Sequence, residues 1–171
     1  ATPISTARLA METFEVIKNE PWCLAVSDRI AWARKLWPTT EFHQMLGGSG
    51  GQGVGYGLPA SVGAALANKS LGRMTVTFQP DGDLLYAPGA LWTAAHHKIP
   101  LLMVMHNNGG YYQEVMHLQR MASMHNRRTD QAWIGNSLRN PDIDYAKIAQ
   151  GMGVWAEGPI KDPAQLKGAL Q

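Results

Sequence analysis

The sequence predicts an α/β domain in which a doubly wound, mostly parallel sheet carries helices on both faces. Short apolar runs of strand length alternate along the chain with segments of helical pattern, which is typical of strand–helix–strand units. Such runs, of which Trp22–Val26 is the clearest, suit strands buried on both faces. The 171 residues, 45% of them hydrophobic, are enough for one domain with a core.

The first third of the chain contains helix and strand signals in alternation. Ser5 or Thr6 can cap a first helix, whose apolar residues continue to Ile17 before Pro21. The other elements expected here are a strand at Trp22–Val26, a helix at Ile30–Leu36 and a strand at Glu41–Leu46 that leads into a glycine-rich loop.

The rest of the chain continues the alternation. Pro59 suits the first turn of a helix because its missing N–H has no partner there in any case. The expected elements are a helix at Ala60–Asn68, a strand at Met74–Gln79, a helix at Ala87–His97, a strand at Leu101–His106, a mobile polar stretch from Met116 to Pro141, a helix at Asp144–Gly151, a strand at Val154–Ala156 and a helix at Pro163–Leu170. We expect residues 1–171 to form one domain.

Composition excludes several classes of function. The 15 basic and 13 acidic residues nearly balance, and the basic residues are scattered, so no nucleic-acid-binding stripe is expected. No apolar run approaches the ~18 residues that a membrane span needs. A single cysteine, Cys23, allows no internal disulfide and favours a cytoplasmic protein.

The most informative feature is a pair of polar motifs that follow two expected strands. Asp81 lies in Pro80-Asp81-Gly82-Asp83, and Asn108 lies 27 positions later in His106-Asn107-Asn108-Gly109-Gly110. A right-handed crossover returns the second strand parallel to the first, so both motifs should lie at the same edge of the sheet. Ligands of such folds bind at that edge.

The residue types at this edge suit magnesium and a diphosphate. Magnesium prefers six oxygen ligands, of which the protein supplies few while phosphates and water supply the others. The carboxylate of Asp81, the amide oxygen of Asn108 and the carbonyl of Gly110 could be the protein ligands, because a glycine lets the backbone turn a carbonyl towards the ion. Each motif alone could also be an ordinary turn after a strand.

Together the motifs resemble the thiamine-diphosphate signature Gly-Asp-Gly followed by Asn-Asn. The resemblance is to the C-terminal, diphosphate-binding domain of the family that includes benzoylformate decarboxylase, pyruvate decarboxylase and acetolactate synthase. It covers nearly the whole chain. The further matching segments are Gly53-Val54-Gly55-Tyr56-Gly57-Leu58-Pro59 (acetolactate synthase), Ala90-Leu91-Trp92-Thr93-Ala94-Ala95 (benzoylformate decarboxylase) and Glu114-Val115-Met116 (pyruvate decarboxylase).

The resemblance implies roles for individual residues. It implies that Asp81, Asn108 and the Gly110 carbonyl bind Mg²⁺, and that Val54 props thiamine diphosphate in a bent shape. The cofactor contacts that it implies are Gln52, Gly53, Val54, Asp81, Gly82, Asp83, Asn108, Gly110 and Tyr111. Two positions depart from the signature: Pro80 replaces its first glycine, and Asp83 replaces a small hydroxyl residue beside the diphosphate.

The resemblance also implies a reaction and a partner. Glu114 lies just beyond the metal loop, by which we mean Asn107–Gly110. It would act as general acid or proton relay on a small 2-oxo acid substrate. Its other interpretation is an ordinary surface residue. In the family an activating glutamate comes from a pyrimidine-binding domain, which nothing here resembles. We therefore expect a fragment or a subunit of a larger, homo-oligomeric enzyme that contributes half of each site.

Three functions stay open from the sequence. The first is decarboxylation of 2-oxo acids, which Glu114 favours. The second is carboligation of the acetolactate synthase kind, which the Gly55-Tyr56-Gly57-Leu58-Pro59 segment favours. The third is a non-catalytic, degenerate domain, which Pro80 and Asp83 would explain. A dinucleotide site at Gly48–Gly53 is disfavoured because no acidic residue occurs between Glu41 and Asp81.

Overall fold

The structure is a computed structural model, and it describes residues 3–26, 30–48, 51 and 53–171. Its centre is a parallel sheet of β1 (Trp22–Ala25), β2 (Met74–Pro80) and β3 (Leu101–His106), in the order β1-β2-β3. Trp22 is paired with Met74, and Thr75 with Leu101. Because the strands are parallel, their carboxyl ends share one edge of the sheet.

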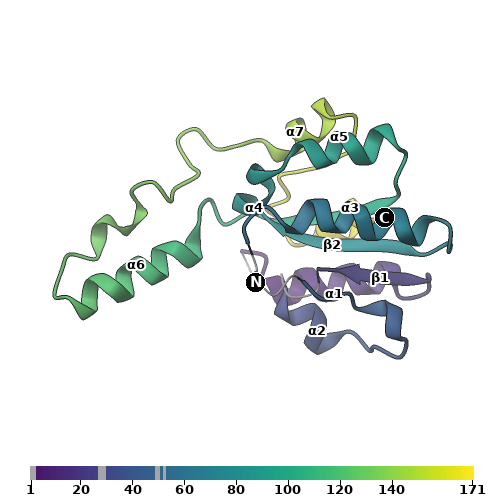
Figure 1. Cartoon of the computed structure of the whole chain (residues 1–171), viewed down its shortest axis with the longest axis horizontal. Helices are drawn as coiled ribbons and strands as arrows, with labels where there is room; N and C mark the ends of the chain where they lie inside the picture. Colours follow the sequence, from purple (N-terminus) through teal and green to yellow (C-terminus); the bar gives the residue numbers. More distant parts are fainter. Residues whose placement is uncertain (1–2, 27–29, 49–50, 52) are drawn as a thin grey trace.

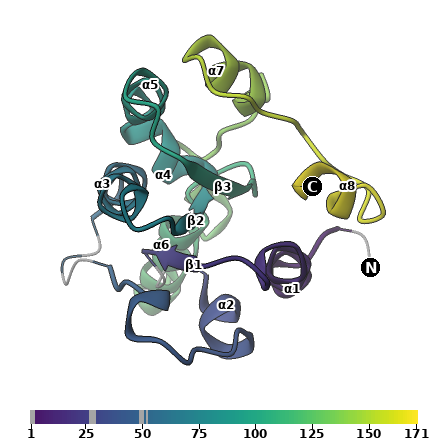
Figure 2. The same cartoon turned by 90° about the vertical axis from the view of Figure 1, so that its right-hand side faces the viewer.

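Helices cover both faces of this sheet (Figure 2). One face packs against α1 (Thr6–Ile17), α2 (Ala31–Leu36) and α8 (Leu166–Leu170), with Phe78 and Trp37 among the buried side chains. The other face packs against α3 (Gly57–Lys69), α4 (Asp81–Tyr86), α5 (Gly89–His96) and α7 (Tyr145–Gly151). The predicted α/β layers with helices on both faces are therefore confirmed.

The first helix begins as the sequence predicts. The Oγ of Ser5 accepts a hydrogen bond from the backbone N–H of Arg8 at 3.2 Å, which satisfies one of the N–H groups that lack a partner at a helix start. Leu9, Ala10 and Ile17 then face the core from this helix.

Replacing Ser5 by alanine should therefore destabilise the domain by about 1 kcal/mol, because the N–H of Arg8 loses its acceptor. Urea denaturation monitored by far-UV circular dichroism measures this change. Ser123→Ala, in the last turns of another helix, provides a control without a capping role. An unchanged midpoint for Ser5→Ala would show that water replaces the cap at no cost.

Three element boundaries differ from the predicted ones. The helix expected at Ala60 begins at Gly57, so Pro59 lies within its first turn. The helix expected at Ala87–His97 is α5, which begins at Gly89 after its N-cap Pro88; the short helix α4 that precedes it, and ends before the non-helical Ala87, was not predicted. Helix α8 is also shorter than predicted, and it begins at Leu166.

Two predicted strands are wrong. Glu41–Leu46 contains the 3₁₀ helix η2 (Phe42–Gln44), which a reciprocal capping box between Glu41 and Gln44 stabilises; only Met45 forms an isolated parallel bridge, with Leu24. Val154–Ala156 is not a strand, because its backbone closes the end of α7 instead. Val154 N–H donates to the carbonyl of Ala149 at 3.0 Å, and Gln150 donates to the carbonyl of Ala156 at 2.9 Å.

The stretch Met116–Pro141, expected to be mobile and polar, contains helical structure that the sequence did not indicate. Helix α6 (Tyr112–Met124) and the 3₁₀ helix η3 (Asp130–Trp133) occupy much of it and together project from the body as an arm (Figure 1). The sequence concealed this helix because few of its side chains are buried; Val115 is its one buried residue. Within the described residues, no helix has the length and apolar character needed to cross a membrane.

Candidate functional site

Asp81 and Asn108 lie at the same edge of the sheet, as their spacing predicts. Asp81 is the first residue of α4, directly after β2, and Asn108 follows β3. The Oδ2 of Asp81 and the Oδ1 of Asn108 each accept a hydrogen bond from the N–H of Gly110, both at 3.1 Å. Two side-chain oxygen atoms that follow separate strands therefore converge on one N–H group.

Asp81 is buried, with only 1% of its surface exposed. Its Oδ2 also accepts from the N–H of Gly109 at 2.8 Å, whereas its Oδ1 has no hydrogen-bond partner among the described residues. A buried carboxylate oxygen without a partner is costly, and a bound cation would satisfy it. This oxygen is the observation that fits a metal ion.

The carbonyl of Gly110 faces the same side as its N–H. Gly110 forms an isolated antiparallel bridge with Ser137. The flanking hydrogen bonds run from Tyr111 N to Asn136 O at 2.8 Å and from Leu138 N to Gly109 O at 2.9 Å. Between such flanking bonds, the N–H and C=O of the central residue point away from the opposite strand. Since the N–H donates to Asp81, the carbonyl is directed towards this side too.

The segment 136–139, which follows the arm, contacts this loop. The sequence did not predict these contacts. Arg139 donates from Nη2 to the carbonyl of Asn108 at 3.1 Å, and its guanidinium lies against Gly109, which has a φ of +77°. A Cβ on Gly110 would lie 2.5 Å from the carbonyl oxygen of Asn136. The loop therefore needs glycine at both positions. No sequence motif marks Arg139 for this contact.

Tyr111 covers the turn at Gly82. A Cβ on Gly82 would lie 2.5 Å from the Tyr111 ring, and the Tyr111 ring meets that of Tyr86 edge to face at 6.0 Å. Burial raises the pKa of Tyr111, and the neighbouring Tyr86 and Asp81 raise it further. The phenol is therefore a neutral hydrogen-bonding group at pH 7 and lies beside the Asp81-Gly82 turn.

Two more polar groups lie near Asp81, the half-buried His106 and the buried Tyr145. Burial lowers the pKa of His106, although the charge of Asp81 opposes this shift. Burial, with smaller contributions from Asp81 and Tyr111, raises the pKa of Tyr145 to about 12. Both groups are therefore uncharged at pH 7.

The glycine-rich loop lies next to this turn. Asp83 accepts a hydrogen bond at Oδ1 from the N–H of Gly55 at 2.7 Å, so its carboxylate faces the loop. Val54 is 43% exposed and available for contact. Gly53 stabilises the loop through its carbonyl, which accepts from Tyr56 N at 3.3 Å. Gln52, the predicted contact to the aminopyrimidine, lies outside the described residues.

Glu114 is an exposed residue in the first turn of α6, the helix with which the arm leaves the body (Figure 1). It lines an open hollow of about 380 Å³. The other lining residues are Gln113, His117, Leu118 and Asn136. The side chain can thus meet a ligand in this hollow.

Comparison with known proteins identifies the family. Residues 27–171 match the family described as thiamine pyrophosphate enzyme, C-terminal TPP binding domain.

This chain belongs to that family.

As a TPP-binding domain, it has relatives with two kinds of named activity. It is 35% identical over 117 residues to IlvX of Mycobacterium tuberculosis, which carries the name of an acetolactate synthase large subunit; the match covers 68% of this chain and 21% of that protein. It is 31% identical over 127 residues to benzoylformate decarboxylase of Pseudomonas aeruginosa, covering 70% and 20%. The chain thus spans about a fifth of the length of these relatives.

A solved structure confirms the fold of this TPP-binding domain. The thiamine diphosphate-dependent 4-hydroxybenzoylformate decarboxylase of Rhodococcus jostii RHA1 superposes with a TM-score of 0.74 at 24% identity. The match covers 99% of this chain and 31% of that structure's chain. At this identity the likeness supports the architecture and carries no residue roles.

Proposed function

We propose that this domain binds thiamine diphosphate through a Mg²⁺ ion held by Asp81, Asn108 and the Gly110 carbonyl. The Oδ1 of Asp81 supports this most strongly, because it is buried beside the loop that carries the other two proposed ligands and has no hydrogen-bond partner in the part of the chain that the structure describes. One carboxylate, one amide and one carbonyl leave room for diphosphate oxygens and water, which is how magnesium is commonly bound.

The remaining predicted contacts surround this point. Gly82 and the backbone of Asp83 follow Asp81 in the first turn of α4, with Tyr111 above them. Gly53 and Val54 approach from the glycine-rich loop, where Val54 would hold the cofactor bent; Gln52 retains its proposed contact. When bound, the cofactor accepts the electron pair that is released as carbon dioxide leaves a 2-oxo acid.

The proposed reaction is decarboxylation of a small 2-oxo acid. Glu114 would deliver or relay the proton that completes product formation, since it lines the hollow at the root of the arm. Carboligation is the second candidate, favoured by the relative that carries an acetolactate synthase name. Analysis of the products formed from benzoylformate and pyruvate distinguishes an aldehyde from a ligated hydroxy-ketone or hydroxy-acid.

The partner would be a pyrimidine-binding domain or subunit that supplies the activating glutamate, in a homo-oligomer. The arm supports this proposal because it exposes large apolar side chains, which usually mark an interaction surface. They are Met116, Leu118, Met121, Met124, Trp133 and Ile134.

Calorimetry tests the binding proposal. Titration of the chain with thiamine diphosphate should release heat in the presence of Mg²⁺, and chelation of the metal should abolish it. Absence of binding in Mg²⁺, even with a pyrimidine-binding partner added, would favour the degenerate, non-catalytic alternative.

In the chain supplied with its pyrimidine-binding partner, replacing Glu114 by glutamine should lower the decarboxylation rate about a hundredfold, because the amide cannot transfer the proton. Cofactor affinity should stay unchanged, since Glu114 is outside the metal loop. Carbon dioxide release and calorimetry measure the two quantities, and Glu157→Gln, at an exposed position away from the site, is the control. A normal rate for Glu114→Gln would exclude the catalytic role.

A further inference from the structure

The carboxylate of Asp83 is directed at the glycine-rich loop. Asp83 lies in the first turn of α4 and is only 4% exposed. Its Oδ1 accepts the N–H of Gly55, 28 positions earlier, at 2.7 Å. A hydrogen bond to a charged acceptor is stronger than one between neutral groups. This contact therefore ties the loop to the helix that begins with Asp81.

The loop backbone closes around this carboxylate. A Cβ on Gly57 would lie 2.5 Å from Oδ2 of Asp83 and 2.6 Å from Oε1 of Gln79. A Cβ on Gly55, where φ is +89°, would lie 2.6 Å from Cβ of Tyr86. Gly55 and Gly57 thus let the loop backbone lie close to Tyr86, Asp83 and Gln79. A larger residue at either position would require these neighbours to move.

A buried polar chain holds the other side of this contact. The Oγ of Ser61 donates to the carbonyl of Gly57 at 2.7 Å and lies 2.8 Å from the Oγ1 of Thr77, which in turn accepts from Nε2 of Gln79 at 2.8 Å. Ser61, Thr77 and Gln79 are fully buried. These hydrogen bonds join the start of α3 to β2.

The hydrogen-bonded N–H belongs to the peptide unit that joins Val54 to Gly55. Holding that peptide plane restricts the backbone on the carboxyl side of Val54, and with it the directions that the Val54 side chain can take. A carboxylate at position 83 therefore controls how the loop presents Val54 to the site.

We propose that Asp83 is a positioning residue, which acts through the Val54–Gly55 peptide to set the side chain that supports the thiamine part of the cofactor. This inference rests on the proposed function. It explains why an aspartate can stand at position 83, where the family has a small hydroxyl residue. The side chain of Asp83 hydrogen-bonds the glycine-rich loop, while its backbone remains available to the diphosphate.

The alternative is that the Asp83 side chain acts on the diphosphate itself, by repulsion or through the metal. The two roles differ in what they require of a ligand. A role through Val54 affects only ligands that carry the thiamine part, whereas a direct electrostatic role affects the diphosphate group whether or not thiamine is attached.

Calorimetry on the full chain in Mg²⁺, with thiamine diphosphate and with inorganic diphosphate, separates these roles. Asp83→Ala should bind thiamine diphosphate about tenfold more weakly, because the charge-assisted hydrogen bond to Gly55 is lost. Its affinity for inorganic diphosphate should change by less than about twofold. Asp83→Asn keeps an acceptor oxygen and should recover most of the affinity.

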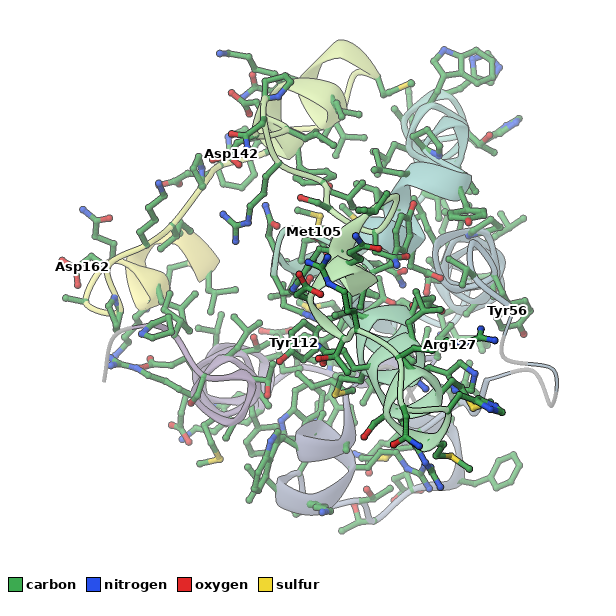
Figure 3. The ribbon with its side chains drawn as sticks, turned by 90° about the vertical axis from the view of Figure 1, so that its left-hand side faces the viewer. Tyr56, Met105, Tyr112, Arg127, Asp142 and Asp162 are labelled. Carbon is green, nitrogen blue, oxygen red and sulfur yellow. The ribbon has the colours of Figure 1, made fainter. Side chains whose placement is uncertain are left out.

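Amide hydrogen exchange provides a readout that needs no cofactor. In the ligand-free chain, Asp83→Ala should accelerate exchange of the Gly55 amide about tenfold or more. Asp162→Ala is the matched control, because Asp162 Oδ1 also accepts a backbone N–H, that of Ala164 at 2.9 Å. Asp162 lies on the far side of the molecule from Tyr56 (Figure 3), so this variant should leave the Gly55 amide unchanged.

Two results would overturn the inference: unchanged exchange at Gly55 in Asp83→Ala, or equal changes in affinity for the two ligands. If the unaltered chain binds neither ligand in Mg²⁺, even with a pyrimidine-binding partner added, the proposed function itself fails, and the positioning role fails with it. Weaker thiamine diphosphate binding with unchanged inorganic diphosphate binding and faster Gly55 exchange would support the inference.

Discussion

Replacing Asp81 by asparagine is expected to weaken binding of thiamine diphosphate in Mg²⁺ about a thousandfold. The substitution removes the negative charge from a buried group whose Oδ1 has no other partner among the described residues. Losing one member of a buried charge pair costs about 3–5 kcal/mol, which corresponds to this loss of affinity. Calorimetric titration at fixed Mg²⁺ measures it.

The same substitution should change the stability of the ligand-free domain by about 1 kcal/mol or less. The amide oxygen of asparagine can still accept from Gly109 and Gly110, as Oδ2 of Asp81 does. Asp142→Asn is the control for charge alone, because Asp142 is exposed and lies near Arg139. Unaltered affinity in Asp81→Asn would mean that the metal, if bound, is held elsewhere.

The ends of strands and their polar residues could be predicted because both depend on local sequence. Continuous apolar runs end in Pro80-Asp81 and His106-Asn107, and parallel crossovers then require a shared edge. The sequence therefore predicted correctly that Asp81 and Asn108 lie together, without any knowledge of distant contacts.

The parts that could not be predicted have different physical causes. Arg139 braces Gly109 from 30 positions away, and its neighbours carry only general turn residues. Helix α6 has mostly exposed side chains, so the periodic apolar pattern that identifies helices is weak there. Val154–Ala156 has the composition of a strand, yet its backbone groups are used to end α7.

Asp83 illustrates the limit of a motif. From the sequence, its charge beside a diphosphate is a departure from the signature that disfavours cofactor binding. The structure turns the carboxylate towards Gly55, and the hydrogen bond at 2.7 Å accommodates the charge there. A signature specifies which residues surround a ligand, but side-chain direction depends on the neighbouring loop.

Replacing Gly110 by alanine should destabilise the domain by about 2–3 kcal/mol, which is a large fraction of the stability of a domain. The added Cβ would lie 2.5 Å from the carbonyl oxygen of Asn136, a backbone atom that cannot rotate away. Urea denaturation measures the loss. Because the same movement displaces the loop from Asp81, affinity for thiamine diphosphate in Mg²⁺ should fall as well.

The opposite sign is expected for the matched control Gly63→Ala. Gly63 lies within α3 on an exposed face, and among the described residues a Cβ there meets no atom within 4 Å apart from its own helix backbone. Alanine should stabilise the helix by about 0.5–1 kcal/mol, since it restricts the unfolded chain more than glycine does. Equal effects of the two substitutions would contradict the close packing of Gly110 against Asn136, and with it the account of how the metal loop is held in place.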